Sequence, residues 1–207
     1  LEGEHATDGE IDVTIGAGAS STTTIAGNLS VTGTGAGASD IDGLSDAVSG
    51  IANFTNSLIL GHQTTGTLSS ADQNTAVGYA AMDAITSGDD NTIMGYNAGS
   101  AVTSASDNVI LGSGAGVTTT DVDGAVIIGQ GAGAADMTSA ADGTVLIGYS
   151  AGAALTSGAD NLAIGENALL EHTTGSRNIA IGVGAMDDTG ANDCPTSIDN
   201  IFIGYGS

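Results

Sequence analysis

A short motif recurs along most of this chain at a nearly constant spacing. Clear copies read NTAVGYAAM, NTIMGYNAG, NVILGSGAG and NIAIGVGAM, and each is centred on one glycine, which we call the anchor. The anchors are Gly61, Gly78, Gly95, Gly112, Gly129, Gly148, Gly165, Gly182 and Gly204. Successive anchors are 17, 17, 17, 17, 19, 17, 17 and 22 residues apart. A fixed period of this size predicts a solenoid, in which each repeat forms one coil and the coils stack.

The three residues before each anchor alternate like a short strand. Residues directly before the anchor and three before it share one strand face, and both positions are mostly aliphatic or β-branched. We therefore expect them to point into the coil. The predicted coil core is Leu60, Val77, Met94, Leu111, Ile128, Ile147, Ile164, Ile181 and Ile203.

The position between those two points to the opposite face and is apolar in every copy. A solvated face would carry Ser, Thr or charged residues, so we expect this row to be buried against another chain. Ordering a coil costs about 25 kcal/mol at roughly 1.5 per residue, more than three or four aliphatic side chains return, which predicts an obligate oligomer. The candidate interface residues are Ile59, Ala76, Ile93, Ile110, Ile127, Leu146, Ala163, Ala180 and Phe202.

The rest of each repeat predicts a second short strand, around Ile85, Val102 and Leu155, and a turn rich in Gly, Asp, Ser and Asn. The expected fold is therefore all-β, a parallel β-roll or β-solenoid of about 17-residue coils over residues 56–207. Residues 1–38 are expected to form a small β segment, with a strand at 10–15. Residues 39–55 are expected to form a connector or cap with a short helix at 40–51, because apolar residues recur there at helical spacing. The chain begins at Leu1 and ends within a repeat, which indicates a fragment.

The charge balance excludes several kinds of partner. The chain has 24 acidic residues against one basic residue, Arg177, and a formal net charge of −23. Nothing in such a chain neutralises phosphates, so a nucleic acid or an anionic membrane surface is not expected as a partner. No apolar run has the length of a membrane helix. Cys194 is the only cysteine and forms no disulfide within the chain.

Catalysis is not expected, because the three histidines, His5, His62 and His172, fall in different parts of the chain and no triad arises from stacked positions. Aspartates do recur just before the predicted strands, so stacking brings carboxylates together along one edge. Either these residues make solvated turns, or the edge collects Ca²⁺ or another hard cation, which needs several oxygen ligands. The candidate ligands are Asp89, Asp90, Asp107, Asp142 and Asp160.

Two further rows have alternative interpretations. A row of threonines, eight residues after the anchors, fits either an exposed strand or an ice-binding face; it comprises Thr86, Thr103, Thr120, Thr156 and Thr173. The four tyrosines each follow an anchor directly and fit either a packed corner of the coil or contacts to a receptor or glycan. They are Tyr79, Tyr96, Tyr149 and Tyr205.

The motif, Asn followed by three apolar residues, Gly and a small residue three positions later, resembles the head repeats of YadA-like trimeric autotransporter adhesins. The variant NTAVGYAAM followed by TSGDDNT is similar to longer repeats in tail fibres of marine bacteriophages. The stretch TIAGNLSVTGT, within residues 1–38, is also similar to shaft sequences of such fibres. The resemblance covers residues 57–207 strongly and residues 1–55 weakly, and it implies a homotrimer of left-handed parallel β-rolls. It implies a structural and attachment segment of an extracellular fibre on a virion surface that contacts a host receptor or glycan. The alternatives are a bacterial adhesin head and, in another class, an ice-binding solenoid.

Overall fold

A computed structural model describes residues 4–5, 11–12, 47–49, 51–62, 64–187 and 196–207. Within these ranges the protein is all-β and contains no α-helix; its one helical segment is a short 3₁₀ turn, η2 (Ser139–Ala141). The chain divides into two units, Leu1–Ser39 and Asp40–Ser207. In the first, β1 (Glu4–His5) and β2 (Ile11–Asp12) form an antiparallel pair. The predicted strand at 10–15 overlaps β2, and the rest of that prediction lies outside the described residues.

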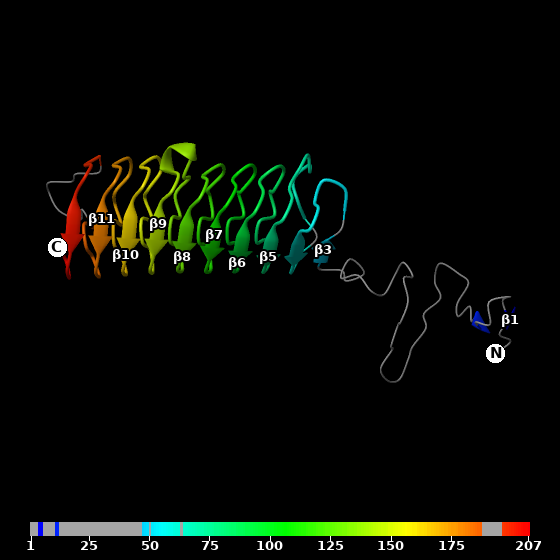
Figure 1. Cartoon of the computed structure of the whole chain (residues 1–207). Coiled ribbons are helices and arrows are strands. Elements are labelled where there is room, and N and C mark those ends of the chain that lie inside the picture. The colour runs from blue at the N-terminus through cyan, green and yellow to red at the C-terminus, as the bar shows by residue number, and fades with distance from the viewer. Residues whose placement is uncertain (1–3, 6–10, 13–46, 50, 63, 188–195) are drawn as a thin grey trace, which may run out of the picture. The chain divides into compact units, whose positions relative to one another are not determined.

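The second unit is a solenoid with one strand per coil, which confirms the predicted stacking of coils (Figure 1). Its strands form one continuous ladder in chain order, and equivalent motif positions lie side by side in neighbouring strands. They are β3 (Ala47–Ser49), β4 (Leu58–Leu60), β5 (Thr75–Val77), β6 (Thr92–Met94), β7 (Val109–Leu111), β8 (Val126–Ile128), β9 (Val145–Ile147), β10 (Leu162–Ile164), β11 (Ile179–Ile181) and β12 (Ile201–Ile203).

Strand β3 differs from the others because it pairs antiparallel with β4, whereas β4 to β12 are parallel. It corrects the prediction of a helix at 40–51: Ala47–Ser49 is a strand, and residues 40–46 and 50 lie outside the described part. Pairing with β4 satisfies backbone groups at that edge of the parallel sheet. Val48, assigned to a helix by its spacing, instead packs on the core of the solenoid.

The predicted second strand around Ile85, Val102 and Leu155 does not form. These three side chains are fully buried, as an inward row requires, but their backbone lies outside any strand. Isolated hydrogen bonds still connect the coils there, such as Thr86 N–H to Thr103 O at 2.9 Å. Residues in the left-handed region, including Met82 (φ 59°) and Leu169 (φ 58°), break the extended backbone that a longer ladder needs.

The two predicted strand rows are interchanged in the structure. The middle position of each strand, predicted to face another chain, points into the solenoid, and from Ile59 to Ala180 its side chains are at most 1% exposed. The position before the anchor, predicted as the coil core, points outward. Met94 is 51% exposed, Ile164 36% and Ile203 67%, and the other members of that row are half-buried. Only Phe202 of the middle row, on the last strand, is half-buried rather than buried.

The buried asparagine column explains this orientation. Asn74, Asn91 and Asn108 immediately precede their strands and are at most 1% exposed. Asn91 donates its backbone N–H and its Nδ2 to Oδ1 of Asn74, both at 3.0 Å, and Asn108 repeats the pattern on Asn91 at 3.2 and 3.0 Å. Because strand side chains alternate, an inward Asn turns the middle residue of the strand inward and the other two outward.

The anchor glycines allow the coils to approach closely. Each anchor has a positive φ of 115–143°, and a Cβ on Gly148 would lie 2.2 Å from the carbonyl oxygen of Gly165 in the next coil. The other anchors from Gly61 to Gly182 meet the backbone of the following anchor in the same way. A side chain at this corner would therefore push adjacent coils apart.

We expect Gly148→Ala to destabilise the solenoid by about 3 kcal/mol or more. The new methyl group would clash with the backbone of the next coil, and Ala would have to adopt the unfavourable positive φ of this position. Gly124→Asn is the matched control. It has a positive φ of 65° with open space around the Cβ position, and Asn tolerates that geometry, so its effect should stay within about 0.5 kcal/mol. Chemical denaturation of both variants gives the comparison; equal midpoints would contradict the role assigned to the anchors.

Candidate functional site: the outer face of the strands

The outward side chains of β4 to β12 form a surface that is apolar except for Thr75 and Thr92, and we call it the outer face. It consists of the first and third residue of each strand, and these are half-buried or exposed in the single chain. Its members are Leu58, Leu60, Thr75, Val77, Thr92, Met94, Val109, Leu111, Val126, Ile128, Val145, Ile147, Leu162, Ile164, Ile179, Ile181, Ile201 and Ile203. A parallel sheet with apolar residues on both faces is characteristic of a sheet covered on both sides.

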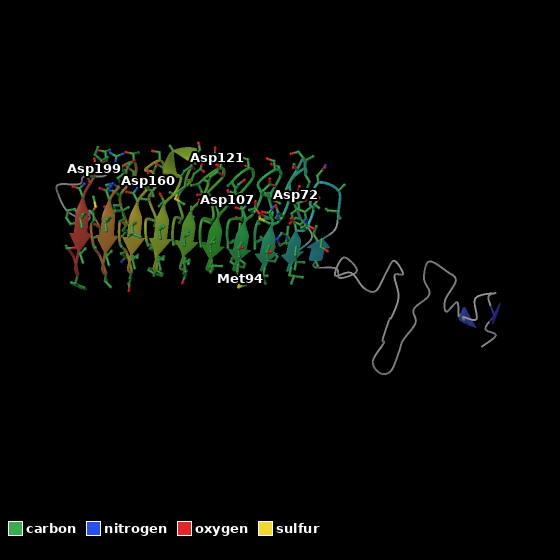
Figure 2. All side chains as sticks on the ribbon, in the orientation of Figure 1. Asp72, Met94, Asp107, Asp121, Asp160 and Asp199 are labelled. Atoms are coloured by element: carbon green, nitrogen blue, oxygen red, sulfur yellow. The ribbon has the colours of Figure 1, made fainter. Side chains whose placement is uncertain are left out.

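The outer face contains no charged residue, although the chain contains 24 acidic ones. The labelled aspartates in Figure 2 lie beyond the N-terminal ends of the strands, whereas Met94 lies at the C-terminal end of its strand. These aspartates are therefore separated from the outer face by the coil geometry, whereas Glu166, which is exposed, directly follows the anchor Gly165 at the other end of the strands. A mostly apolar surface without charge, which extends over nine strands of a strongly acidic chain, has the properties of a protein interface.

The four tyrosines continue from the outer face onto the next edge of the coil. Tyr79, Tyr96, Tyr149 and Tyr205 are 66%, 59%, 53% and 88% exposed, so the interpretation as a packed corner is wrong. The rings of Tyr79 and Tyr96 stack with centroids 5.7 Å apart and an interplanar angle of 13°. We call this row the tyrosine edge. The equivalent positions in other coils include Ser113 and Gln130, both exposed.

The predicted aspartate edge separates into two rows with different structural roles. Asp89 and Asp142 each accept a backbone N–H from the preceding coil, from Asp72 at 2.7 Å and Asp123 at 2.8 Å. The other three candidate ligands, Asp90, Asp107 and Asp160, occupy the left-handed turn position with φ of 57–61°. Asp72 and Asp123 themselves bond in the same way to Thr55 and Ser106, each at 2.7 Å.

Among the residues that the structure describes, no three His, Cys, Asp or Glu side chains come together as a metal site. The five candidate ligands are distributed between the two rows, and two of them already accept backbone hydrogen bonds. Turn formation and coil-to-coil bonding therefore account for the recurrence of Asp in this part of the repeat.

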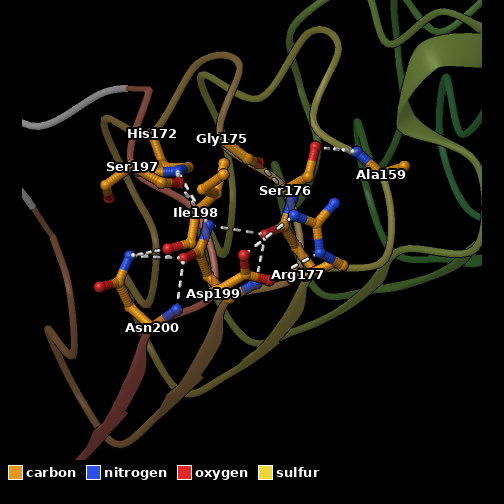
Figure 3. A network of polar contacts seen from close by, with 11 residues as sticks. Ala159, His172, Gly175, Ser176, Arg177, Ser197, Ile198, Asp199 and Asn200 are labelled. Atoms are coloured by element: carbon orange, nitrogen blue, oxygen red, sulfur yellow. Dashed lines mark hydrogen bonds and ion pairs between the residues drawn. The ribbon is translucent and has the colours of Figure 1, made fainter.

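The chain's one basic residue lies in the left-handed turn row and pairs with the aspartate of the next coil (Figure 3). Arg177 Nε donates to Asp199 Oδ1 at 2.6 Å, and a terminal guanidinium nitrogen donates to Oδ2 at 3.0 Å. The hydrogen bond from Arg177 lowers the pKa of Asp199, and the same interaction raises the pKa of Arg177. Both side chains are more than half exposed, so this pair adds little to stability.

We expect Arg177→Gln to raise the pKa of Asp199 toward its ordinary value, because the charged donor is removed. In the native chain the pair's contribution is fully present above the unfolded Asp value of 3.8 and is lost as the pH falls through the lowered folded pKa. An NMR titration of the Asp199 carboxyl carbon measures this shift. An identical titration curve in the variant would contradict the assignment.

The threonine row forms hydrogen bonds within the solenoid. The hydroxyl groups of Thr86, Thr103 and Thr156 donate to the carbonyl of the equivalent residue in the next coil at 2.9–3.2 Å. These hydroxyls therefore take part in stacking the coils. His62 and His172 lie in different coils and bond to backbone groups, His62 to Ala81 O at 2.8 Å and His172 to Ser197 O at 3.1 Å. His5 lies in β1 of the first unit.

Comparison of the chain with known proteins yields no significant match to a family model, to a curated protein or to a solved structure. Within the described residues, no helix is long and apolar enough to cross a membrane. The functional assignment must therefore be argued from the surfaces of the solenoid itself.

Proposed function

We propose that this chain is a structural and attachment segment of a homotrimeric fibre. The observation that supports the proposal is the outer face: an apolar, charge-free sheet surface that runs along the whole solenoid. Three copies joined through this surface would bury it around a common axis. The acidic turns would then remain in solvent, where salt screens their repulsion.

Energetics favours a second and third copy of the chain as the occupant of this surface. Each aliphatic side chain removed from water contributes about 1.5–3 kcal/mol, and the contribution repeats at every coil. A straight partner with the same rise per coil matches the whole length of the face, and a copy of this chain has that geometry. The resemblance of the repeats to those of phage tail fibres and trimeric adhesins leads to the same assembly, and we assign the segment to the virion surface.

In this proposal the segment extends the fibre, keeps it rigid and attaches it to a host cell, and it catalyses no reaction. The nine anchors maintain a regular stack, and the continuous strand ladder resists bending on the strand side. Attachment is assigned to the tyrosine edge. Tyrosine supplies large, rigid contact area at low entropic cost, and it is concentrated in binding surfaces together with Ser, Asn and Gly, which recur on this edge.

We expect the native particle to have three times the mass of the chain. The double variant Met94→Glu with Ile164→Glu should dissociate it into single chains, because both new carboxylates would be buried in the proposed interface. Ser104→Glu with Thr174→Glu is the matched control, since it adds the same charge at exposed turn positions. Analytical ultracentrifugation measures the mass of all three proteins. A folded native monomer, or dissociation by the control pair alone, would contradict the trimer.

We expect Tyr79→Ser, Tyr96→Ser and Tyr149→Ser together to weaken receptor binding at least about tenfold, because exposed aromatic anchors carry most of the energy of such surfaces. A glycan microarray probed with the labelled protein provides the measurement. Ser113→Ala with Gln130→Ala, on the same edge but without rings, is the control. Equal binding by the tyrosine variant would contradict a role of the tyrosine edge in attachment. An unchanged particle mass in this variant would show that weaker binding does not result from loss of assembly.

A further inference from the structure

The asparagine column is interrupted in the middle of the solenoid. Ala125 and Thr144 occupy the positions of Asn in two successive coils, and both are fully buried. Ala125 N–H still donates to Asn108 Oδ1 at 2.8 Å, but Ala125 has no side-chain oxygen for the next coil. Thr144 donates its hydroxyl to Gly158 O at 3.2 Å. Within the described residues, no side-chain oxygen of the preceding coil accepts a hydrogen bond from the backbone N–H of Thr144 or of Asn161.

The threonine row is interrupted one coil earlier, on a different side of the coil. Thr120 Oγ1 donates to the side chain of Asp136, at Oδ1 and 3.2 Å, instead of to a backbone carbonyl of the next coil. Its backbone N–H reaches Met137 O at 3.5 Å, whereas the equivalent bonds from Thr86 and Thr103 measure 2.9 and 3.0 Å. The regular carbonyl bonds of the threonine row are therefore altered next to the coils in which the asparagine column is interrupted.

Two further features weaken the same part of the stack. The 19-residue spacing between Gly129 and Gly148 accommodates η2, a 3₁₀ turn without a side-chain cap. The buried hydroxyl of Thr119 has no hydrogen-bond partner, at a position that holds Ile85, Val102 or Leu155 in other coils. A buried polar group without a partner destabilises its surroundings.

The strand side, by contrast, is uninterrupted at this place. Strand β8 pairs with β7 and β9 over all three residues, in the same parallel register as elsewhere. The inner residues Ile110, Ile127 and Leu146 are fully buried. The loss of bonds is therefore confined to the turn side of the coils.

We propose that residues 112–165 form a built-in hinge that opens on the turn side while the strand sheet stays paired. This inference goes beyond the proposed function: it depends on hydrogen bonds within one chain and holds whether or not the chain assembles. The hinge divides the solenoid into two more stable blocks, which comprise residues 57–62 with 64–111 and residues 166–187. Because the hinge is less stable than the flanking coils, it is the part of the solenoid that bends or opens first.

Native-state hydrogen exchange on the whole protein tests the hinge directly. In the wild type, the amides of Thr144 and Asn161 should exchange about tenfold faster than those of Asn91, Asn108 and Asn178, because each lacks the side-chain acceptor that the others have. The amides of β8 and β9 should remain as protected as those of β6 and β7.

Thr144→Asn should restore the missing hydrogen bond. The new side-chain NH₂ group would donate to Gly158 O in place of the Thr144 hydroxyl, and the new Oδ1 would accept from the backbone N–H of Asn161. We expect exchange of the Asn161 amide to slow about tenfold, to the rate of the other ladder amides. Asn91→Thr is the matched control, because it introduces the same break into a regular block. It should speed exchange at Asn108 to a similar degree.

Uniform exchange along the wild-type solenoid would overturn the hinge, as would an Asn161 amide whose rate is the same in Thr144→Asn. Faster exchange throughout Thr144→Asn would mean that the site rejects Asn for steric reasons. In that case Asn91→Thr decides: a new fast-exchanging coil at Asn108 supports the hinge, and unchanged exchange there contradicts it.

Discussion

The buried asparagine column is the constraint on which the rest of the structure depends. An Asn side chain inside a narrow coil has its polar atoms satisfied only if the neighbouring coil presents the complementary groups in register. The stacked amides supply those groups and hold the coils one repeat apart. Because the next three residues are extended, the orientation of Asn determines which side chains enter the core and which face outward.

This orientation divides the surface of the molecule into chemically distinct parts. The outward residues of β4 to β12 are free of charge and, apart from Thr75 and Thr92, apolar, and the acidic residues of the described solenoid lie in the turns. The single chain thus presents an apolar sheet face that an isolated soluble protein would cover. Assembly through this face and attachment through the neighbouring tyrosine edge use different residues, so the two proposed roles are separable by mutation.

The solenoid and its 17-residue coils could be predicted from the glycine spacing alone, because the period requires stacking. The direction of the strand side chains could not, since all three strand positions are mostly apolar. The informative exceptions were Thr75 and Thr92, whose polar side chains mark the outward row. The different roles of Asp89 and Asp90 could not be predicted either, because these neighbouring aspartates have the same side chain but belong to different rows. Val48 was assigned to a helix by its spacing, but pairing with β4 determined its strand.

Cross-linking with cysteines at adjacent positions tests the orientation of the strands and the assembly together. In a Cys194→Ser background, Leu111→Cys places a thiol on the outer face and Ile110→Cys places one inside the coil. A short bismaleimide should join chains carrying Leu111→Cys into covalent oligomers, and chains carrying Ile110→Cys should remain single on a denaturing gel. Oligomers formed through Ile110→Cys, or through neither variant, would contradict a trimer joined by the outer face.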